Sequence, residues 1–362
     1  MATPLINSAT YAYRISTLLK KLIPIVFIGL MLNVFFSFVW HDADLLAVTV
    51  NFSTPYFVVA VLLVILPWFA NAMRLYIWTR FFGLKLSFTE TFSIVVMGEF
   101  GAAITPSAVG SGPVKIGLLI HKKLSTGAAL SIATLTTLED LAFFVPAIPL
   151  ALTLAAAWDM PFMRIFYDNL QANLSGVGIG VVSLITIILL LHKFWPKNNK
   201  GKEDSTSGSP SFWERRIAHG KKILNEFIIA LAMIQQRGKA RFFATTLLSG
   251  IQWICRYSII TAIAASLGIH AHPILFFVLQ WIIFTITVFI PTPGAMGGAE
   301  ASFYLIFSPF LPSQSLGLIT AGWRLLSFYL FLACGAAIYG ALRLVQAAKR
   351  KSIAAAELVL AE

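Results

Sequence analysis

The feature that most constrains this chain is a series of apolar runs long enough to cross a lipid bilayer. A transmembrane helix needs about 20 consecutive, mostly apolar residues. Hydrophobic residues make up 58% of the 362 residues and charged residues only 12%, about half the charged share of a soluble domain. The sequence therefore predicts an all-α polytopic membrane protein and excludes a soluble enzyme, a disordered scaffold and a disulfide-stapled secreted domain. The predicted spans are 22–40, 56–78, 125–157, 174–192, 242–267 and 315–342.

The distribution of basic residues predicts how these spans are oriented. The chain carries 27 Lys and Arg against 15 Asp and Glu, a formal net charge of +12. Basic residues of membrane proteins gather in cytoplasmic loops. If both termini are cytoplasmic, all basic residues fall on that side except Arg164 outside and Arg74, Arg256 and Arg324 within spans. We therefore predict a multi-pass protein of the cell inner (cytoplasmic) membrane and expect no nucleic-acid partner.

Two further apolar segments, 89–112 and 273–311, are broken by Gly and Pro. Basic residues flank the first on both sides, whereas the second lies in the stretch without Lys or Arg between Arg256 and Arg324. We therefore predict two re-entrant helical hairpins that open to opposite sides. Irregular backbone at that depth must be buried in protein or line a wet cavity, because lipid cannot satisfy its amides. The predicted tip residues are Pro106, Gly110 and Gly112 in the first hairpin and Pro291, Pro293, Gly297 and Gly298 in the second.

The order of these segments predicts two inverted repeats, each of three spans plus one re-entrant hairpin. Ile-Thr-Pro-Ser in the first hairpin resembles Ile-Pro-Thr-Pro in the second. Paired Gly/Pro-broken segments in two halves of opposite topology indicate a transporter site at the repeat interface. The predicted units are a first repeat, 1–192, a basic cytoplasmic linker, 193–241, and the remainder of the second repeat, 242–362. The second repeat begins with the span 174–192, and an amphipathic helix over 212–234 is expected to lie on the membrane surface or on the protein's own cytoplasmic side.

Ionisable residues inside the apolar segments are the candidate site residues. A charge at the centre of a bilayer costs at least about 2.5 kcal/mol, so such residues are functional candidates. The arginines could bind the phosphate of a lipid headgroup, or they could pair with buried carboxylates, and Arg74 could extend to the cytoplasmic surface. The candidate headgroup-binding residues are Arg74, Lys115, Arg256 and Arg324. The carboxylates that could balance them or relay protons are Glu99, Glu139, Asp140 and Glu300.

Two other polar clusters carry weaker alternatives. His270 and His272 lack a nearby carboxylate or thiolate, so a solvated turn is favoured over a metal site. Asp42 and Asp44 could belong to a metal-dependent transferase, but a polar outer loop is favoured. We expect no metal, no cofactor and no catalytic residue.

The two broken segments resemble a known family. Residues 98–141, GEFGAAITPSAVGSGPVKIGLLIHKKLSTGAALSIATLTTLEDL, are similar to the lysylphosphatidylglycerol synthase transmembrane family, and 291–303, PTPGAMGGAEASF, resembles its second signature. The resemblance implies the lipid flippase domain of multiple peptide resistance factors. The chain stops after its last span, so we expect neither the soluble aminoacyl-transferase domain nor lysine transfer. Lys115 stands where the family motif is expected to hold Arg, which keeps the charge but loses the bidentate geometry.

Together these features predict a lipid transporter, either a flippase or a scramblase. Its substrate would be an anionic phospholipid or a polyprenyl-phosphate-type lipid, and its partners membrane lipids; a homo-oligomer stays open. The alternatives are a lipid-linked glycosyl- or headgroup-transferase that uses Asp42 and Asp44, and a secondary transporter of a small anion.

Overall fold

The computed structural model describes residues 52–105, 109–158, 160, 164, 212–338 and 340. The described residues form helices and no β-strand, as predicted. Four helical segments are long and apolar enough to span a membrane: α3 (Thr54–Phe81), α6 (Thr126–Leu154), α10 (Lys239–Ser266) and Ser313–Ile338. They match four predicted spans within a few residues. The predicted spans 22–40 and 174–192, the flexible part of the linker, Asp42, Asp44 and Pro106 lie outside the described residues.

Local sequence signals set where these helices begin. Pro55 occupies the first turn of α3, where its missing N–H has no intrahelical partner to lose. Ser87 and Glu90 form a reciprocal capping box at the start of α4 (Phe88–Ile104). The hydroxyl of Ser125 accepts the Ala128 N–H at the start of α6. At the start of α11 (Pro273–Thr287), His272 Nδ1 accepts the Leu275 N–H, which gives this histidine a capping role.

Each of the two broken segments folds into a helical hairpin. The first hairpin consists of α4 and α5 (Ser111–His121), and the Lys122–Glu90 ion pair joins its two outer ends. The second consists of α11 and α12 (Gly298–Phe307), which pack against each other. In the first hairpin, a Cβ on Gly110 would lie 2.3 Å from the Gly101 carbonyl oxygen. This glycine therefore permits the close approach of the two helices near the tip.

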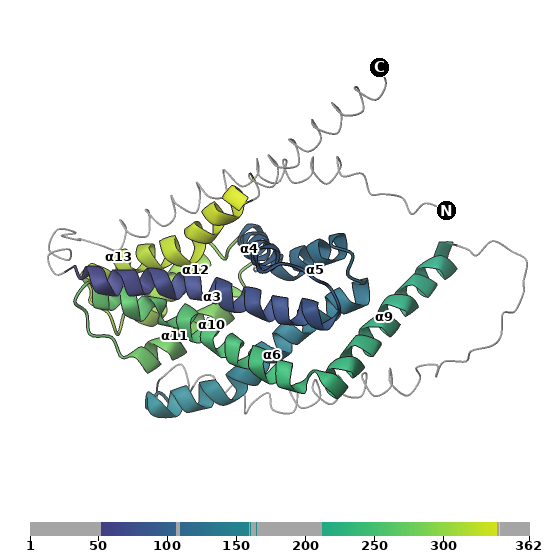
Figure 1. Cartoon of the computed structure of the whole chain (residues 1–362). Coiled ribbons are helices and arrows are strands. Elements are labelled where there is room, and N and C mark those ends of the chain that lie inside the picture. Colours follow the sequence, from purple (N-terminus) through teal and green to yellow (C-terminus); the bar gives the residue numbers. More distant parts are fainter. Residues whose placement is uncertain are drawn as a thin grey trace, which may run out of the picture.

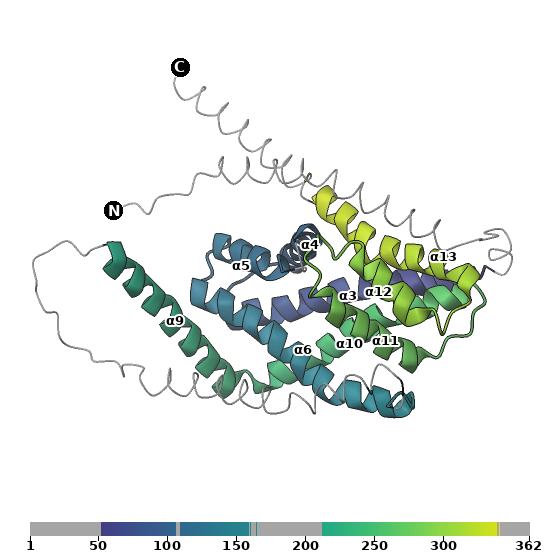
Figure 2. The same cartoon turned by 180° about the vertical axis from the view of Figure 1, so that it is seen from behind.

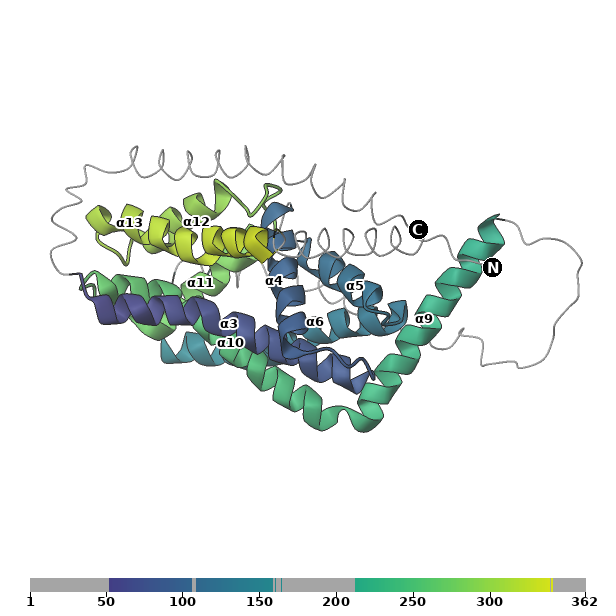
Figure 3. The same ribbon diagram turned by 45° about the horizontal axis from the view of Figure 1, so that its top comes forward.

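The centre of the fold is an antiparallel pair of helices, α3 and α10 (Figure 1). The Ser53 N–H donates to the Ser266 carbonyl oxygen, so the start of α3 lies at the end of α10. Viewed from behind, α11, α12 and α13 (Ser313–Arg324) lie toward one end of α3 and α5 toward the other (Figure 2). The helix α9 (Phe212–Arg237) extends away from the body beyond α5 (Figure 3). The final part of α9 packs on α6, since Ala230 and Ile234 are buried there.

The distribution of side chains is that of a protein surrounded by lipid. Large apolar side chains are exposed along the outer faces of the long helices, whereas Arg74, Glu139, Glu300 and Arg324 are buried inside. A water-soluble protein would reverse this pattern, because exposed apolar patches of this extent mark contact with lipid or protein. The exposed apolar residues include Phe57, Leu62, Leu66 and Phe69 on α3, Leu138, Leu141 and Val145 on α6, and Phe243, Leu247 and Ile251 on α10.

Candidate functional site

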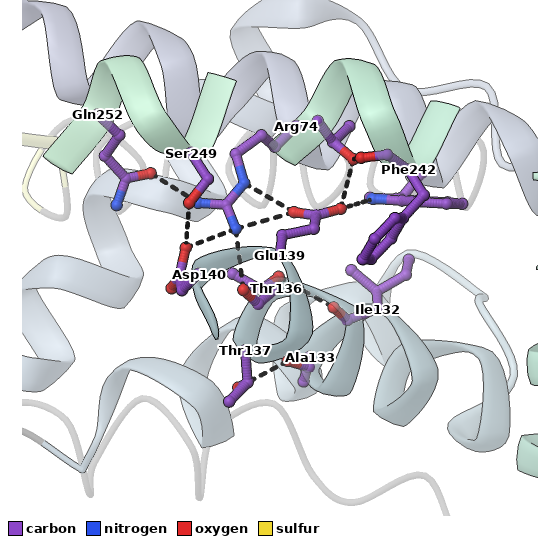
Figure 4. Close-up of polar contacts among 12 residues, drawn as sticks. Arg74, Ile132, Ala133, Thr136, Thr137, Glu139, Asp140, Phe242, Ser249 and Gln252 are labelled. Carbon is purple, nitrogen blue, oxygen red and sulfur yellow. Dashed lines mark hydrogen bonds and ion pairs between the residues drawn. The ribbon is translucent and has the colours of Figure 1, made fainter. Parts of the chain in front are cut away.

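Arg74 lies at the centre of a buried polar cluster between α3, α6 and α10 (Figure 4). Its Nε donates to Glu139 Oε2 at 2.8 Å, and its Nη2 donates to Asp140 Oδ1 and to the Thr136 carbonyl oxygen, each at 2.9 Å. Its Nη1 donates to Gln252 Oε1 at 2.9 Å. The side chains of Arg74 and Glu139 are only 2% and 0% exposed. Arg74 therefore faces the buried carboxylates and does not extend to the cytoplasmic surface.

The two carboxylates of this cluster have further donors. Glu139 Oε1 accepts the Trp78 indole N–H and the Thr245 hydroxyl. Asp140 Oδ1 accepts the Ser249 hydroxyl in addition to Arg74. Buried charges are tolerated when they are paired and hydrogen-bonded. The arrangement joins three spans of the bundle, as a structural ion pair would.

The residues of α10 in this region form a polar stripe that our sequence interpretation missed. Thr245, Ser249, Gln252 and Arg256 are spaced by four, three and four residues within an otherwise apolar run. Residues three and four apart lie on the same face of a helix. This spacing was the available signal that Thr245, Ser249 and Gln252 belong to the charged cluster.

A second buried ion pair joins α12 to α13. Arg324 Nε donates to Glu300 Oε1 at 2.6 Å, and its Nη2 donates to the Gly294 carbonyl oxygen at 3.2 Å. Glu300 Oε2 accepts the Gly297 N–H at 2.8 Å, so this carboxylate also caps α12. A π-helical turn, η1 (Leu325–Tyr329), follows Arg324 directly. Such turns occur frequently at functional sites.

The third charged group joins the first hairpin to α10, and its Arg–Glu pair is more exposed than the Arg74–Glu139 and Arg324–Glu300 pairs. Arg256 Nη2 donates to Glu99 Oε2 at 3.0 Å, and each of these side chains is 16% exposed. Lys115 Nζ lies 3.8 Å from Glu99 Oε1. The sequence predicted that Lys115 lies in a basic flank outside the first hairpin, and this was wrong, because α5 continues to His121 and places Lys115 within the hairpin. The lysine charge lies at the wall of a polar cavity.

Aromatic rings and a glycine position these two cations. The Arg256 guanidinium carbon lies 5.5–5.7 Å from the ring centroids of Trp253, Phe284 and Phe331, within the range of cation–π attraction. A Cβ on Gly98 would lie 2.5 Å from Cε of Lys115, so Gly98 makes room for the lysine side chain.

Among the described residues, Arg256 donates a single hydrogen bond, whereas Arg74 donates four. Arg256 thus has N–H groups available for a further acceptor.

A cavity of 440 Å³ lies against this third charged group. Every described helix from α3 to α13 except α9 contributes to its wall, including both arms of the first hairpin. The volume is that of an ordinary small-ligand site. The charged residues that line it are Glu99, Lys115, Asp140, Arg256 and Arg324, and the neutral polar ones include Asn71, Ser111, Thr136, Thr137, Gln252 and Ser327.

The predicted tip residues divide between packing and the cavity. Gly110 is buried against α4, whereas Gly112 lines the cavity and a Cβ there would meet nothing within 4 Å. In the second hairpin, a Cβ on Gly298 would lie 2.4 Å from Ile290 Cδ1, and Gly297 has a φ of +80°. Pro291 and Pro293 lie in the loop between α11 and α12. The start of α12 is thus capped by its own Glu300, while the start of α5 lies at the cavity wall.

These features define a helical integral membrane protein with a charged cavity inside its helix bundle. The chain belongs to the family described as the lysylphosphatidylglycerol synthase transmembrane region, whose sequence model matches residues 19–335. This confirms the resemblance found in the sequence. A UPF0104 membrane protein of Archaeoglobus fulgidus is 26% identical over 285 residues, which cover 77% of this chain and 84% of that protein. No solved structure matches the chain. Membership of this family is consistent with a lipid-related role in the membrane.

Proposed function

We propose that the protein transports an anionic lipid between the two leaflets of the cytoplasmic membrane. The observation that carries the proposal is the pair of cations, Lys115 and Arg256, that share one carboxylate, Glu99, at the wall of the cavity. These two cations share one carboxylate, while Asp140 at the same wall is held by Arg74, so a headgroup phosphate would be bound by charge-assisted hydrogen bonds from Lys115 and Arg256. The cavity has room for a headgroup, while the acyl chains remain in the bilayer. The transported lipid is an anionic phospholipid or a polyprenyl phosphate.

The arrangement of the helices supports alternating access by two inverted repeats. The spans α3 and α10 are antiparallel, and each is followed by a helical hairpin and then by another candidate span. Transporters of this kind hold the substrate between the repeats and rock one repeat against the other. We propose that the first hairpin opens to the cytoplasm and the second to the outside, with both termini cytoplasmic.

Cysteine accessibility tests this orientation. Lys122 and Ser313 are exposed residues near the open ends of the first and second hairpins. Single Lys122→Cys and Ser313→Cys variants, in a background without Cys255 and Cys334, should react with a membrane-impermeant maleimide from opposite sides. Labelling of both from the same side would contradict opposed hairpins.

Reconstitution tests the transport itself. Liposomes that contain the purified protein and a panel of headgroup-labelled lipids, polyprenyl phosphate included, should show protein-dependent movement of one lipid class. A carrier of small anions would instead move glycerol phosphate without acyl chains. A transferase that uses Asp42 and Asp44 would lose its activity in the Asp42→Ala/Asp44→Ala variant, whereas lipid transport should survive that change.

A further inference from the structure

Glu99 differs from the other buried glutamates in how weakly it is held. Glu139 accepts hydrogen bonds from Arg74, Trp78 and Thr245, and Glu300 accepts bonds from Arg324 and a backbone N–H. Among the described residues, Glu99 has one hydrogen bond, from Arg256, and a longer contact with Lys115. It also lines the cavity, which Glu139 and Glu300 do not. Of these three glutamates, Glu99 is therefore the one that a ligand in the cavity could displace with the loss of the fewest hydrogen bonds.

The three residues of this group come from three helices. Glu99 lies on α4 and Lys115 on α5, the two arms of the first hairpin, whereas Arg256 lies on α10 of the central pair. The Glu99–Arg256 ion pair, with N and O 3.0 Å apart, is thus an ionic link between the hairpin and the bundle. Arg256 donates a hydrogen bond to this carboxylate, and Lys115 Nζ lies 3.8 Å from its other oxygen, so two positive charges face one anion.

The geometry points to Glu99 as an internal anion that occupies the phosphate site until the substrate displaces it. The ligand is a phosphate group, which takes the place of the carboxylate between Lys115 and Arg256. Because the exchange breaks the link from α4 to α10, binding of the phosphate also removes this ionic contact between the first hairpin and α10, while the apolar packing of α4 on α3 remains. That the phosphate belongs to a lipid rests on the proposed function. The exchange of carboxylate for phosphate rests on the positions of Lys115 and Arg256 around Glu99.

Neutralisation of Glu99 distinguishes the two roles that this carboxylate could have. If Glu99 only orients the two cations, its neutralisation should weaken the binding of an anion. If it competes with the anion, Glu99→Gln should tighten binding, because the amide keeps the shape of the side chain but not its charge. Hydrogen bonds to charged groups are strong enough that the expected gain is at least about tenfold in Kd, or about 1.4 kcal/mol.

Binding to the purified full-length protein in a neutral detergent tests this directly. The probes are dihexanoyl phosphatidylglycerol and, in a separate arm, inorganic phosphate, both titrated at one fixed ionic strength by calorimetry. Glu90→Gln is the matched control, since Glu90 lies on the same helix as Glu99 and pairs outside the cavity with Lys122, the residue that follows α5. Glu99→Asp provides a second variant, which keeps the charge but shortens the reach to Arg256 and should tighten binding to a smaller degree.

Tighter binding in Glu99→Gln, with no change in Glu90→Gln, would support the exchange. Unchanged or weaker binding of both probes in Glu99→Gln would overturn it. If Glu99→Gln does not fold, weaker or unchanged binding in Glu99→Asp would overturn it as well. Tighter binding of inorganic phosphate with no binding of dihexanoyl phosphatidylglycerol would support the exchange and would contradict a phosphatidylglycerol-type lipid as the transported substrate.

Discussion

The cluster around Arg74 allows a prediction that separates stability from transport. Arg74→Ala removes the cation that holds Glu139 and Asp140 and leaves two carboxylates without their counter-ion. Removal of one partner from a buried ion pair costs about 3–5 kcal/mol. The hydrogen bonds from Trp78 and Thr245 to Glu139 remain in the variant. The free energy of unfolding should therefore fall by about 3–5 kcal/mol and not by the sum of the four hydrogen bonds that Arg74 donates.

A second change should restore most of that stability. Glu139→Gln in the Arg74→Ala background removes the orphaned charge but keeps an oxygen that accepts from Trp78 and Thr245. We expect it to recover about 2–3 kcal/mol, because a neutral amide needs no counter-ion. Reversible unfolding in mixed micelles, followed by tryptophan fluorescence, measures both values. Arg241→Ala is the control, since Arg241 is exposed and stacks on Phe81. The reasoning is refuted if Arg74→Ala unfolds like the wild-type protein, or if Glu139→Gln restores nothing.

Two further predictions concern the first hairpin. Gly98→Ala should displace the Lys115 side chain from Glu99 and weaken anion binding several-fold with little loss of stability, because the crowded atom belongs to a flexible side chain. Gly117→Ala is its control in the same titration, since Gly117 lies on α5 outside the cavity and a Cβ there would meet nothing within 4 Å. The hydrogen bond from Lys122 lowers the pKa of Glu90 to about 2. The Glu90 carboxylate therefore stabilises the folded state fully above its unfolded pKa near 4.5, and this contribution is lost as the pH falls toward 2. For an exposed pair this amounts to at most about 1 kcal/mol. The protection factors of the amide hydrogens at the start of α4, which are corrected for the intrinsic pH dependence of exchange, should fall in that pH window in the wild-type protein but stay level in Glu90→Gln.

The spans and hairpins could be predicted because the bilayer imposes a simple rule on the sequence. Runs of about 20 apolar residues must become helices, since no water is present to satisfy the backbone. The four described spans therefore agree with the predicted ones, and each of the two segments broken by Gly and Pro forms a helical hairpin. That the two hairpins open to opposite sides of the membrane stays a prediction. The end of α5 was missed because Lys115 appeared to close the apolar run, although it lies in a polar cavity where its charge is tolerated.

The partners of each charge could not be predicted, because they depend on how distant helices pack. Nothing local indicates that Arg74 pairs with Glu139 on α6 while Arg256 pairs with Glu99 on α4. The spacing of the polar residues on α10 could have been recognised in the sequence. Such a spacing shows which face of α10 is polar, but it does not show which other helix packs against that face. The π-helical turn after Arg324 follows from no residue pattern that we recognise.

The most direct test of the central claim compares two arginines on the same helix. Arg256 lines the cavity, whereas Arg241 lies exposed near the start of α10. In liposomes, Arg256→Ala should lower the rate of lipid transport about ten- to hundredfold, since it removes a charge-assisted contact worth about 1.5–3 kcal/mol, and Arg256→Lys should recover part of it. Arg241→Ala should transport like the wild-type protein. Undiminished transport by a folded Arg256→Ala variant would contradict a headgroup site in this cavity.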